Sequence, residues 1–307
     1  MNLSGKRFLS ALKGNYLGQL ALVVVIVLLT MVLFAPYISP HDPNKFNLPE
    51  RNKPPVFLMD GDWKYPLGTD PHGRDVLSRI IHGARVSLGT ATAGVSIAVF
   101  LGVILGICSG YLGGVWDSAI MRSVDVLLSI PLILMALIVV AILGSHLINI
   151  IIVMGAAGWI WHARIVRGNV LRIREEQYVL AAINLGTPKI KIVFLHLLPN
   201  LYGPIMVTAT IQIGYMVILE SGLSFFGITG STLSWGWDIA FGRSYLGTAW
   251  WVSSFPGVAI FLSVFSFNLL GDFLRDLLDP QGRQITKACL LYTSPSPRDA
   301  TLSGIPS

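Results

Sequence analysis

The chain has 307 residues, of which 53% are hydrophobic and only 12% are charged, with a formal net charge of +6. Soluble domains carry about 25% charged residues, so this composition excludes an ordinary soluble fold and indicates a protein of the lipid bilayer. The two cysteines, Cys108 and Cys289, exclude a disulfide framework and a thiolate metal site.

Five runs without charged residues predict membrane spans, because a helix needs about 20 mostly apolar residues to cross the hydrocarbon. The third run is about twice that length and contains Gly144-Ser145-His146 near its middle, so it predicts two helices joined by a tight turn. The sequence therefore predicts an all-α polytopic membrane protein with six transmembrane helices. The runs lie between Lys13 and Asp42, Arg85 and Asp117, Asp125 and Arg164, Lys191 and Glu220, and Arg243 and Asp272.

The first run resembles a secretory signal peptide only in its positive flank. Its apolar core, Leu17 to Phe34, is longer than a typical signal core and ends in Ala35-Pro36-Tyr37 without a small-x-small cleavage site. We therefore expect residues 1–16 to form an N-terminal segment and residues 17–38 the first span, with a cleaved signal peptide as the alternative.

Orientation follows from the lysines and arginines, because positive loops resist translocation. Six spans place both termini on one side, and the basic loop after the fourth span favours the cytoplasm for that side. Its basic residues are Arg164, Arg167, Arg172, Arg174, Lys189 and Lys191. Residues 39–88 would then be external, with Gly68 to Arg85 as an amphipathic segment on the outer surface, and residues 89–280 would form a five-helix core.

The stretch LAAINLGTPKIKIVFLHLLPN, Leu180 to Asn200, lies in the largest cytoplasmic connection and predicts two short helices meeting at an elbow. Gly186 stands where a left-handed residue ends the first helix. Thr187 is expected to cap the second helix, with Pro188 at its first position and Pro199 at its end. A solvated loop and a segment that inserts into a groove of a partner protein are both open at this point.

The spacing of Ala181-Ala182, Gly186 and His196-Leu197-Leu198-Pro199 resembles the "EAA" loop of permease subunits of bacterial ABC importers. Leu180 stands where the general pattern has Glu, and His196 stands where it has Ile; the histidine is typical of the peptide-permease branch. The resemblance implies an ATPase-coupling loop over residues 164–202. Its expected contact residues are Leu180, Ala181, Ala182, Gly186, Thr187, Pro188, His196, Leu198 and Pro199.

Two further segments resemble the C-type permeases of dipeptide and oligopeptide importers. They are PLGTDPHGRDVLSRIIHGARVSL (Pro66 to Leu88) and SFPGVAIFLSVFSFNLLGDFLRDLLDP (Ser254 to Pro280). The resemblance implies the type I importer permease fold in the bacterial inner membrane. It also implies four kinds of partner: a homologous B-type permease, two ATPase subunits, an extracytoplasmic substrate-binding protein and the bilayer, with no nucleic acid.

The chain contains no G-x-x-x-x-G-K-[ST] phosphate loop, so the resemblance implies that ATP and Mg²⁺ are used by the partner ATPases and that this chain binds no cofactor. We identify no catalytic residue and no metal ligand set, which disfavours an intramembrane enzyme. A secondary transporter or channel is a more distant alternative, but the spans are nearly free of charge and show no internal repeat.

Two polar residues lie near the ends of predicted spans. Glu220, at the outer end of the fifth span, is a candidate for the substrate pathway or gate, with capping or an interface contact as alternatives. His162, close to Arg164, is expected at the membrane interface.

The substrate and the C-terminal tail are the least determined features. Di- or oligopeptides are the expected cargo, with nickel or glutathione-like compounds as the alternative within the same architecture. Residues 281–307 form a tail beyond the family resemblance. Its Pro- and Ser-rich part, 288–307, is interpreted as vector- or adaptor-derived sequence, with a natural disordered tail as the alternative.

Overall fold

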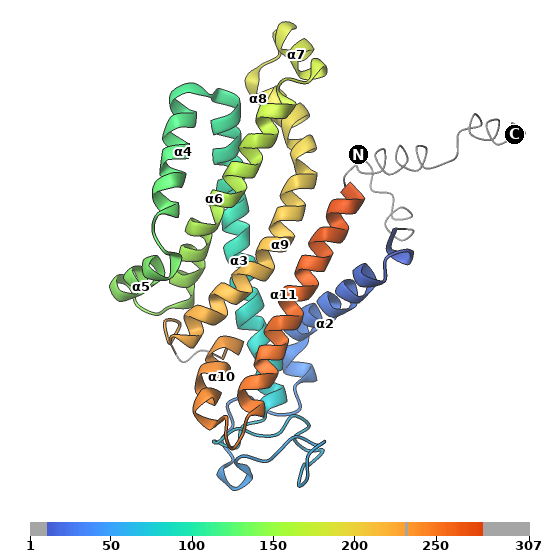
Figure 1. Cartoon of the computed structure of the whole chain (residues 1–307), viewed down its shortest axis with the longest axis vertical. Helices are drawn as coiled ribbons and strands as arrows, with labels where there is room; N and C mark the ends of the chain where they lie inside the picture. The colour runs from blue at the N-terminus through green and yellow to red at the C-terminus, as the bar shows by residue number, and fades with distance from the viewer. Residues whose placement is uncertain (1–10, 231–232, 279–307) are drawn as a thin grey trace, which may run out of the picture.

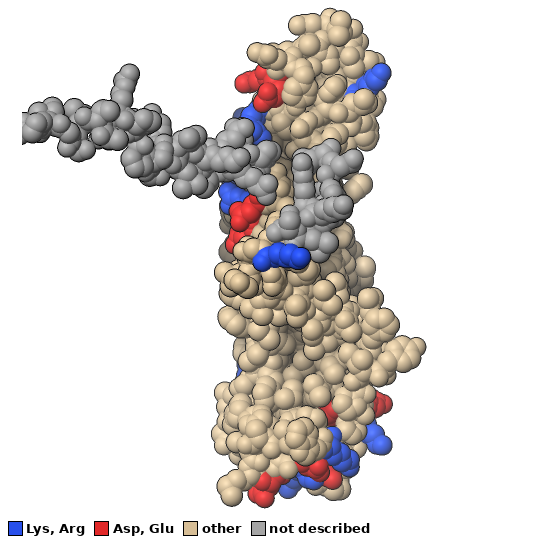
Figure 2. Space-filling model, turned by 90° about the vertical axis from the view of Figure 1, so that its right-hand side faces the viewer, with Lys and Arg blue, Asp and Glu red and all other residues tan. Residues whose placement is uncertain are grey.

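The computed structural model describes residues 11–230 and 233–278, and within these ranges every regular element is helical (Figure 1). The C-terminal tail, residues 281–307, lies outside the described residues. Long helices run along the molecule, with α7 and α8 at the top of Figure 1 and the connection between α2 and α3 at the bottom. Figure 2 shows charged side chains gathered toward the two ends, with a broad, almost uncharged band between them. This distribution is typical of a membrane-spanning bundle.

Five helical segments are long and apolar enough to span a membrane, or six if the bent helix pair counts as one span. The prediction of an all-α polytopic fold is therefore confirmed. The long segments are α2 (Tyr16–Ile38), α3 (Val76–Ile107) with its π-helical extension η2 (Cys108–Leu112), α6 (Leu147–Ile173), α9 (Leu198–Phe225) and α11 (Trp251–Leu278).

The core forms where α2, α3, α6, α9 and α11 meet, with Leu28, Leu88, Met154, Met216 and Phe267 among its buried side chains. Close contact between α3 and α6 depends on glycines of α3. A Cβ atom at Gly102 would lie 2.4 Å from the Cβ of His162, so only glycine fits there. Without a hydrophobic driving force in lipid, such close packing is a main source of helix association.

Helix α3 begins ahead of the charge-free run. It starts at Val76, within the segment 39–88 that we expect to be external, so residues 76–85 of the expected surface segment are continuous with the second long helix. Asp75 caps the helix by accepting a hydrogen bond from the backbone N–H of Ser78 at 3.2 Å. The charged Arg79 continues the helix because its charge is satisfied by a residue distant in sequence, Asp238, rather than by solvent.

The third charge-free run is divided as predicted but also breaks once more. Gly144, with φ +85°, separates α5 (Leu132–Leu143) from α6. A second break at Ser129–Pro131 bends α4 (Gly114–Leu128) against α5 by 87°. Pro131 lacks a backbone N–H and disfavours helical geometry at Ile130, so a straight third span cannot form.

Two short helices complete the end of the molecule that holds the α2–α3 connection: η1 (Leu48–Glu50) and α10 (Trp235–Gly242), the latter followed by the 3₁₀ turn η4 (Arg243–Tyr245). Trp235 is fully buried, and its indole N–H donates to the carbonyl oxygen of Ile80 at 2.9 Å. The contact fixes α10 against the start of α3.

Candidate coupling site

The elbow begins where α6 ends. After Ile173 the chain turns and forms α7 (Gln177–Asn184). Gly186 has φ +76°, as the sequence predicted. The N–H of Thr187 donates to Ala182 at 3.1 Å and that of Gly186 donates to Ile183 at 2.9 Å. These two bonds define a Schellman motif, which requires a left-handed residue and therefore favours glycine.

The second half of the elbow differs from the prediction. Helix α8 (Lys189–Ile192) starts after Pro188, which is its N-cap residue rather than its first helical residue, and the Thr187 side chain makes no capping bond. The predicted capping by Thr187 is therefore wrong. Proline fixes φ near −65° and lets the chain enter the helix without a side-chain cap.

Pro199 does not end the second helix. Instead α8 continues through the π-helical turn η3 (Val193–Leu197) into α9, giving one segment from Lys189 to Phe225. Pro199 lies in the first turn of α9, where η3 has shifted the hydrogen-bond pattern and a missing N–H is tolerated. The elbow is therefore directly continuous with a membrane span.

A buried apolar cluster joins the elbow to the bundle. Val179 of α7, Ile192 of α8 and Leu197 of η3 pack against Val170 and Ile173 of α6, and all five side chains are buried. Motion of the elbow would therefore be transmitted to α6 and α9 through packed side chains rather than through a loose loop.

Polar contacts reinforce this packing. The Arg174 guanidinium donates to the carbonyl oxygen of Gly110 in η2 at 3.1 Å, and the amide of Asn200 donates to the Tyr178 hydroxyl at 3.2 Å. The rings of Tyr178 and His196 lie 5.9 Å apart. Partial burial, and secondarily the Glu176 carboxylate, raise the pKa of Tyr178, so its hydroxyl stays protonated and available for hydrogen bonding.

The outer face of the elbow is apolar and exposed. Leu185 is 86% exposed and Ile190 is 73% exposed, on either side of Gly186. Leu180 and Ile183 add further exposed apolar surface from α7. Because α7 projects beyond the other helices (Figure 1), this surface lies at the end of the molecule rather than in the uncharged band. Exposed apolar side chains at such an end are typical of a protein-binding surface.

The predicted contact residues divide into two groups. The first group has six members: Leu180, Ala181 and Ala182 of α7, and Gly186, Thr187 and Pro188 of the turn that follows. Ala182 and Thr187 are half-buried, and the other four are exposed. The others belong to the helix that continues into the span: His196 and Leu198 are half-buried and Pro199 is exposed. The first group forms the outer surface, and the second connects it to α9.

Glu220 lies inside the subunit. Its side chain is fully buried, and its Oε1 atom accepts a hydrogen bond from the Ser224 hydroxyl at 2.7 Å. The Ser221 hydroxyl lies 3.4 Å from the other carboxylate oxygen. The structure therefore places this carboxylate in a serine-lined interior position and not on a surface of the subunit.

Comparisons with known proteins agree along most of the chain. A family model described as "binding-protein-dependent transport system inner membrane component" matches residues 98–284. A second model, the "N-terminal TM domain of oligopeptide transport permease C", matches residues 5–55.

Three curated relatives illustrate the range of names. The probable D,D-dipeptide transport system permease of Escherichia coli (strain K12) is 36% identical, covering 91% of this chain and 92% of the relative. The di/tripeptide transport system permease of Pseudomonas aeruginosa (strain UCBPP-PA14) is 38% identical, over 86% and 88%. The nickel transport system permease of Escherichia coli (strain K12) is 36% identical, over 88% and 96%.

Proposed function

The chain belongs to the family of binding-protein-dependent transport system inner membrane components, the permeases of peptide and nickel ABC importers, and we propose that it forms half of a translocation path for dipeptides or short oligopeptides. Its elbow couples that path to ATP hydrolysis by partner subunits. The observation that carries the coupling proposal is the exposed apolar turn around Gly186, packed rigidly onto α6 and α9.

The coupling step is mechanical. Closure of two ATPase subunits on ATP moves the grooves in which the elbows sit, and α6 and α9 follow as rigid bodies. The small side chains of Ala181 and Ala182, beside Gly186, allow a groove to approach the backbone closely. Leu185 and Ile190 supply the apolar surface whose burial stabilises the contact.

The proposed assembly contains this chain, a homologous B-type permease, two ATPase subunits and an extracytoplasmic substrate-binding protein, as is general for the family. ATP and Mg²⁺ are used by the ATPase subunits, and this chain binds no cofactor of its own. Import of nickel or a glutathione-like compound is the alternative, and the name of the nickel-transporting relative supports it.

Purified alone, the chain is expected to hydrolyse no ATP and to move no substrate, because it has neither a phosphate-binding loop nor the second half of the path. Co-reconstitution in proteoliposomes with the partner permease, the ATPases and the binding protein should restore ATP hydrolysis and uptake together. Uptake of labelled peptide by the chain alone would contradict the proposal and favour a secondary transporter.

Membrane orientation can be tested with single cysteines in a Cys108→Ser, Cys289→Ser background. We propose that the termini and the elbow are cytoplasmic. Met59→Cys, at a 93% exposed position between α2 and α3, should react with an impermeant thiol reagent in intact spheroplasts. Lys189→Cys should react only after permeabilisation. The reverse pattern would invert the topology, because the two positions lie at opposite ends of the bundle (Figure 1).

A further inference from the structure

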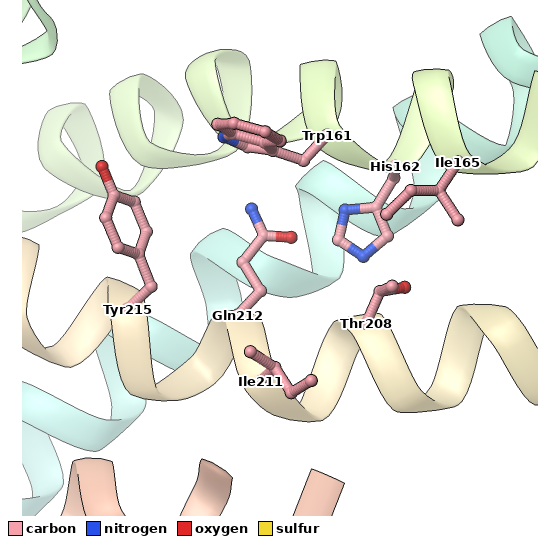
Figure 3. A pocket seen from close by; sticks show the side chains of 7 residues that line it. All are labelled: Trp161, His162, Ile165, Thr208, Ile211, Gln212 and Tyr215. Carbon is pink, nitrogen blue, oxygen red and sulfur yellow. The ribbon is translucent and has the colours of Figure 1, made fainter. Parts of the chain in front are cut away.

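A pocket with polar side chains lies between α6 and α9, near the middle of both helices. Its volume is about 290 Å³. Figure 3 shows the His162 ring reaching from α6 toward α9 and the Gln212 side chain reaching back from α9 toward α6. His162, which we expect near the membrane interface, is buried between these two helices.

Three buried polar atoms of this pocket lack hydrogen-bond partners among the described residues: both ring nitrogens of His162 and Oε1 of Gln212. His162 is 1% exposed and neither of its ring nitrogens has a partner among the described residues. The Gly158 carbonyl and the Gln212 side chain are its polar neighbours but do not reach it with hydrogen-bond geometry. The Gln212 amide nitrogen donates to the Gly158 carbonyl at 3.1 Å, which leaves its Oε1 atom without a partner.

Leaving these buried groups unpaired costs about 1–3 kcal/mol for each donor or acceptor. In a membrane span, a polar side chain kept at such a cost is by default a candidate functional group. The packing also makes room for the pair. A Cβ atom at Gly158 would lie 2.7 Å from the Gln212 amide nitrogen, and glycine at position 102 admits the His162 side chain.

We propose that this pocket is a transit site for one peptide amide group and the apolar side chain beside it. The inference rests on the proposed function, because it assumes that peptides pass along this subunit. A neutral imidazole offers one donor and one acceptor, and Gln212 Oε1 offers a second acceptor. A peptide bond carries the complementary N–H donor and C=O acceptor.

The walls of the pocket fit an uncharged ligand segment. Trp161 and Tyr215, which are 55% and 50% exposed, flank the polar pair, and Ile165 and Ile211 complete an apolar lining. The pocket lining contains no carboxylate, lysine or arginine, so a charged peptide terminus would lose hydration without gaining a counter-charge. The imidazole nitrogens are covered, so the proposal requires the side chain of Trp161 or of Gln212 to rotate before a ligand reaches them.

The same chemistry disfavours bare Ni²⁺ as the occupant. One imidazole and one neutral amide are too few ligands for a transition metal ion. The part of the chain that the structure describes contains no group of three or more His, Cys, Asp or Glu residues placed to hold a metal. At about 290 Å³ the pocket lies at the lower end of small-molecule sites, which suits one or two residues of a peptide.

Photocrosslinking in the complete importer tests the proposal directly. Tyr215→p-benzoylphenylalanine is introduced into the full chain, and the complex is reconstituted with its partner permease, ATPases and binding protein. A panel of tritiated di- and tripeptides is added with ATP, and ⁶³Ni²⁺ uptake is measured in parallel. We expect a labelled peptide adduct on this subunit that excess unlabelled peptide removes. Tyr202→p-benzoylphenylalanine, on α9 outside the pocket, is the matched control and should give little adduct.

Leucine substitutions supply the second readout. His162→Leu and Gln212→Leu should each lower peptide uptake roughly fivefold to tenfold, the loss expected for one hydrogen bond. Membrane abundance and ATPase co-purification should stay within about twofold of wild type. His146→Leu, at an exposed turn, should leave uptake unchanged.

The outcomes separate this inference from the proposed function. If the wild-type complex carries peptide but Tyr215→p-benzoylphenylalanine captures only lipid or the partner permease, the pocket is an interface and the inference fails alone. If the wild-type complex carries only ⁶³Ni²⁺, or no peptide of the panel, the peptide proposal and this inference both fail. Unchanged uptake in both leucine variants would also overturn the pocket as a transit site.

Discussion

Replacing Gly186 with arginine is expected to abolish substrate uptake by the assembled importer while the variant still accumulates in the membrane. At φ +76°, a non-glycine residue costs roughly 1–2 kcal/mol, and nothing lies within 4 Å of the position where a Cβ atom would be. This local cost is small beside the packing of the helix bundle. The added bulk and charge, however, lie on the apolar surface that we propose as the ATPase contact.

Three measurements check this prediction: membrane abundance, co-purification of the ATPases, and ATP hydrolysis stimulated by loaded binding protein. We expect the first to be near wild type and the other two to fall. Gly186→Ala separates backbone strain from the effect of added bulk and charge, because it introduces the strain alone. This variant should retain most of the uptake.

Gly227→Arg is the matched control for the arginine. Gly227 has φ +78°, has nothing within 4 Å of its Cβ position and ends α9 with the same pair of hydrogen bonds, Gly227 N–H to Ser224 and Ile228 N–H to Leu223. It therefore carries equal strain away from the elbow. Normal stimulated hydrolysis and uptake in Gly186→Arg, or an equal loss of ATPase binding in Gly227→Arg, would exclude the elbow as the coupling contact.

Local sequence chemistry was sufficient to predict those structural features that depend on short-range interactions. The left-handed Gly186 and the turn at Gly144 follow from glycine's freedom at positive φ, and both are confirmed. The apolar runs predicted the spans because lipid requires them to be long and uncharged. The resemblance of the loop then indicated the family, which the comparisons confirm.

Features that depend on distant partners were not predictable in the same way. Helix α3 starts at Val76, ahead of the charge-free run that begins after Arg85, and Asp238 neutralises Arg79 across the fold. Pro199 was expected to break a helix, but the π-helical turn η3 precedes it and removes the conflict. The buried position of His162 depends on Gly102 of another helix, and no local pattern signals such a contact.

Removing Asp238 is expected to be the most destabilising single side-chain change at the end of the bundle opposite the elbow. The Asp238 carboxylate accepts from the Arg79 guanidinium, through Nε at 2.9 Å and through a second nitrogen, and both side chains are buried. Another Arg79 nitrogen donates to the Pro43 carbonyl at 3.2 Å. The pair thus joins α3, α10 and the connection between α2 and α3. Breaking a buried pair by removing one partner costs about 3–5 kcal/mol, because the other charge is left uncompensated.

Asp238→Ala should therefore lower the melting temperature of the detergent-purified chain and its membrane abundance, and Arg79→Leu should do the same. The double variant Arg79→Leu, Asp238→Leu should recover much of the loss, since no buried charge remains. The exposed pair of Arg164 and Asp125, joined at 2.6 Å, is the control. Asp125→Ala should change stability by less than about 1 kcal/mol because solvent screens that pair. Equal effects of Asp238→Ala and Asp125→Ala would show that the Arg79–Asp238 pair does not hold this end of the bundle together, and α10 would then depend mainly on the burial of Trp235.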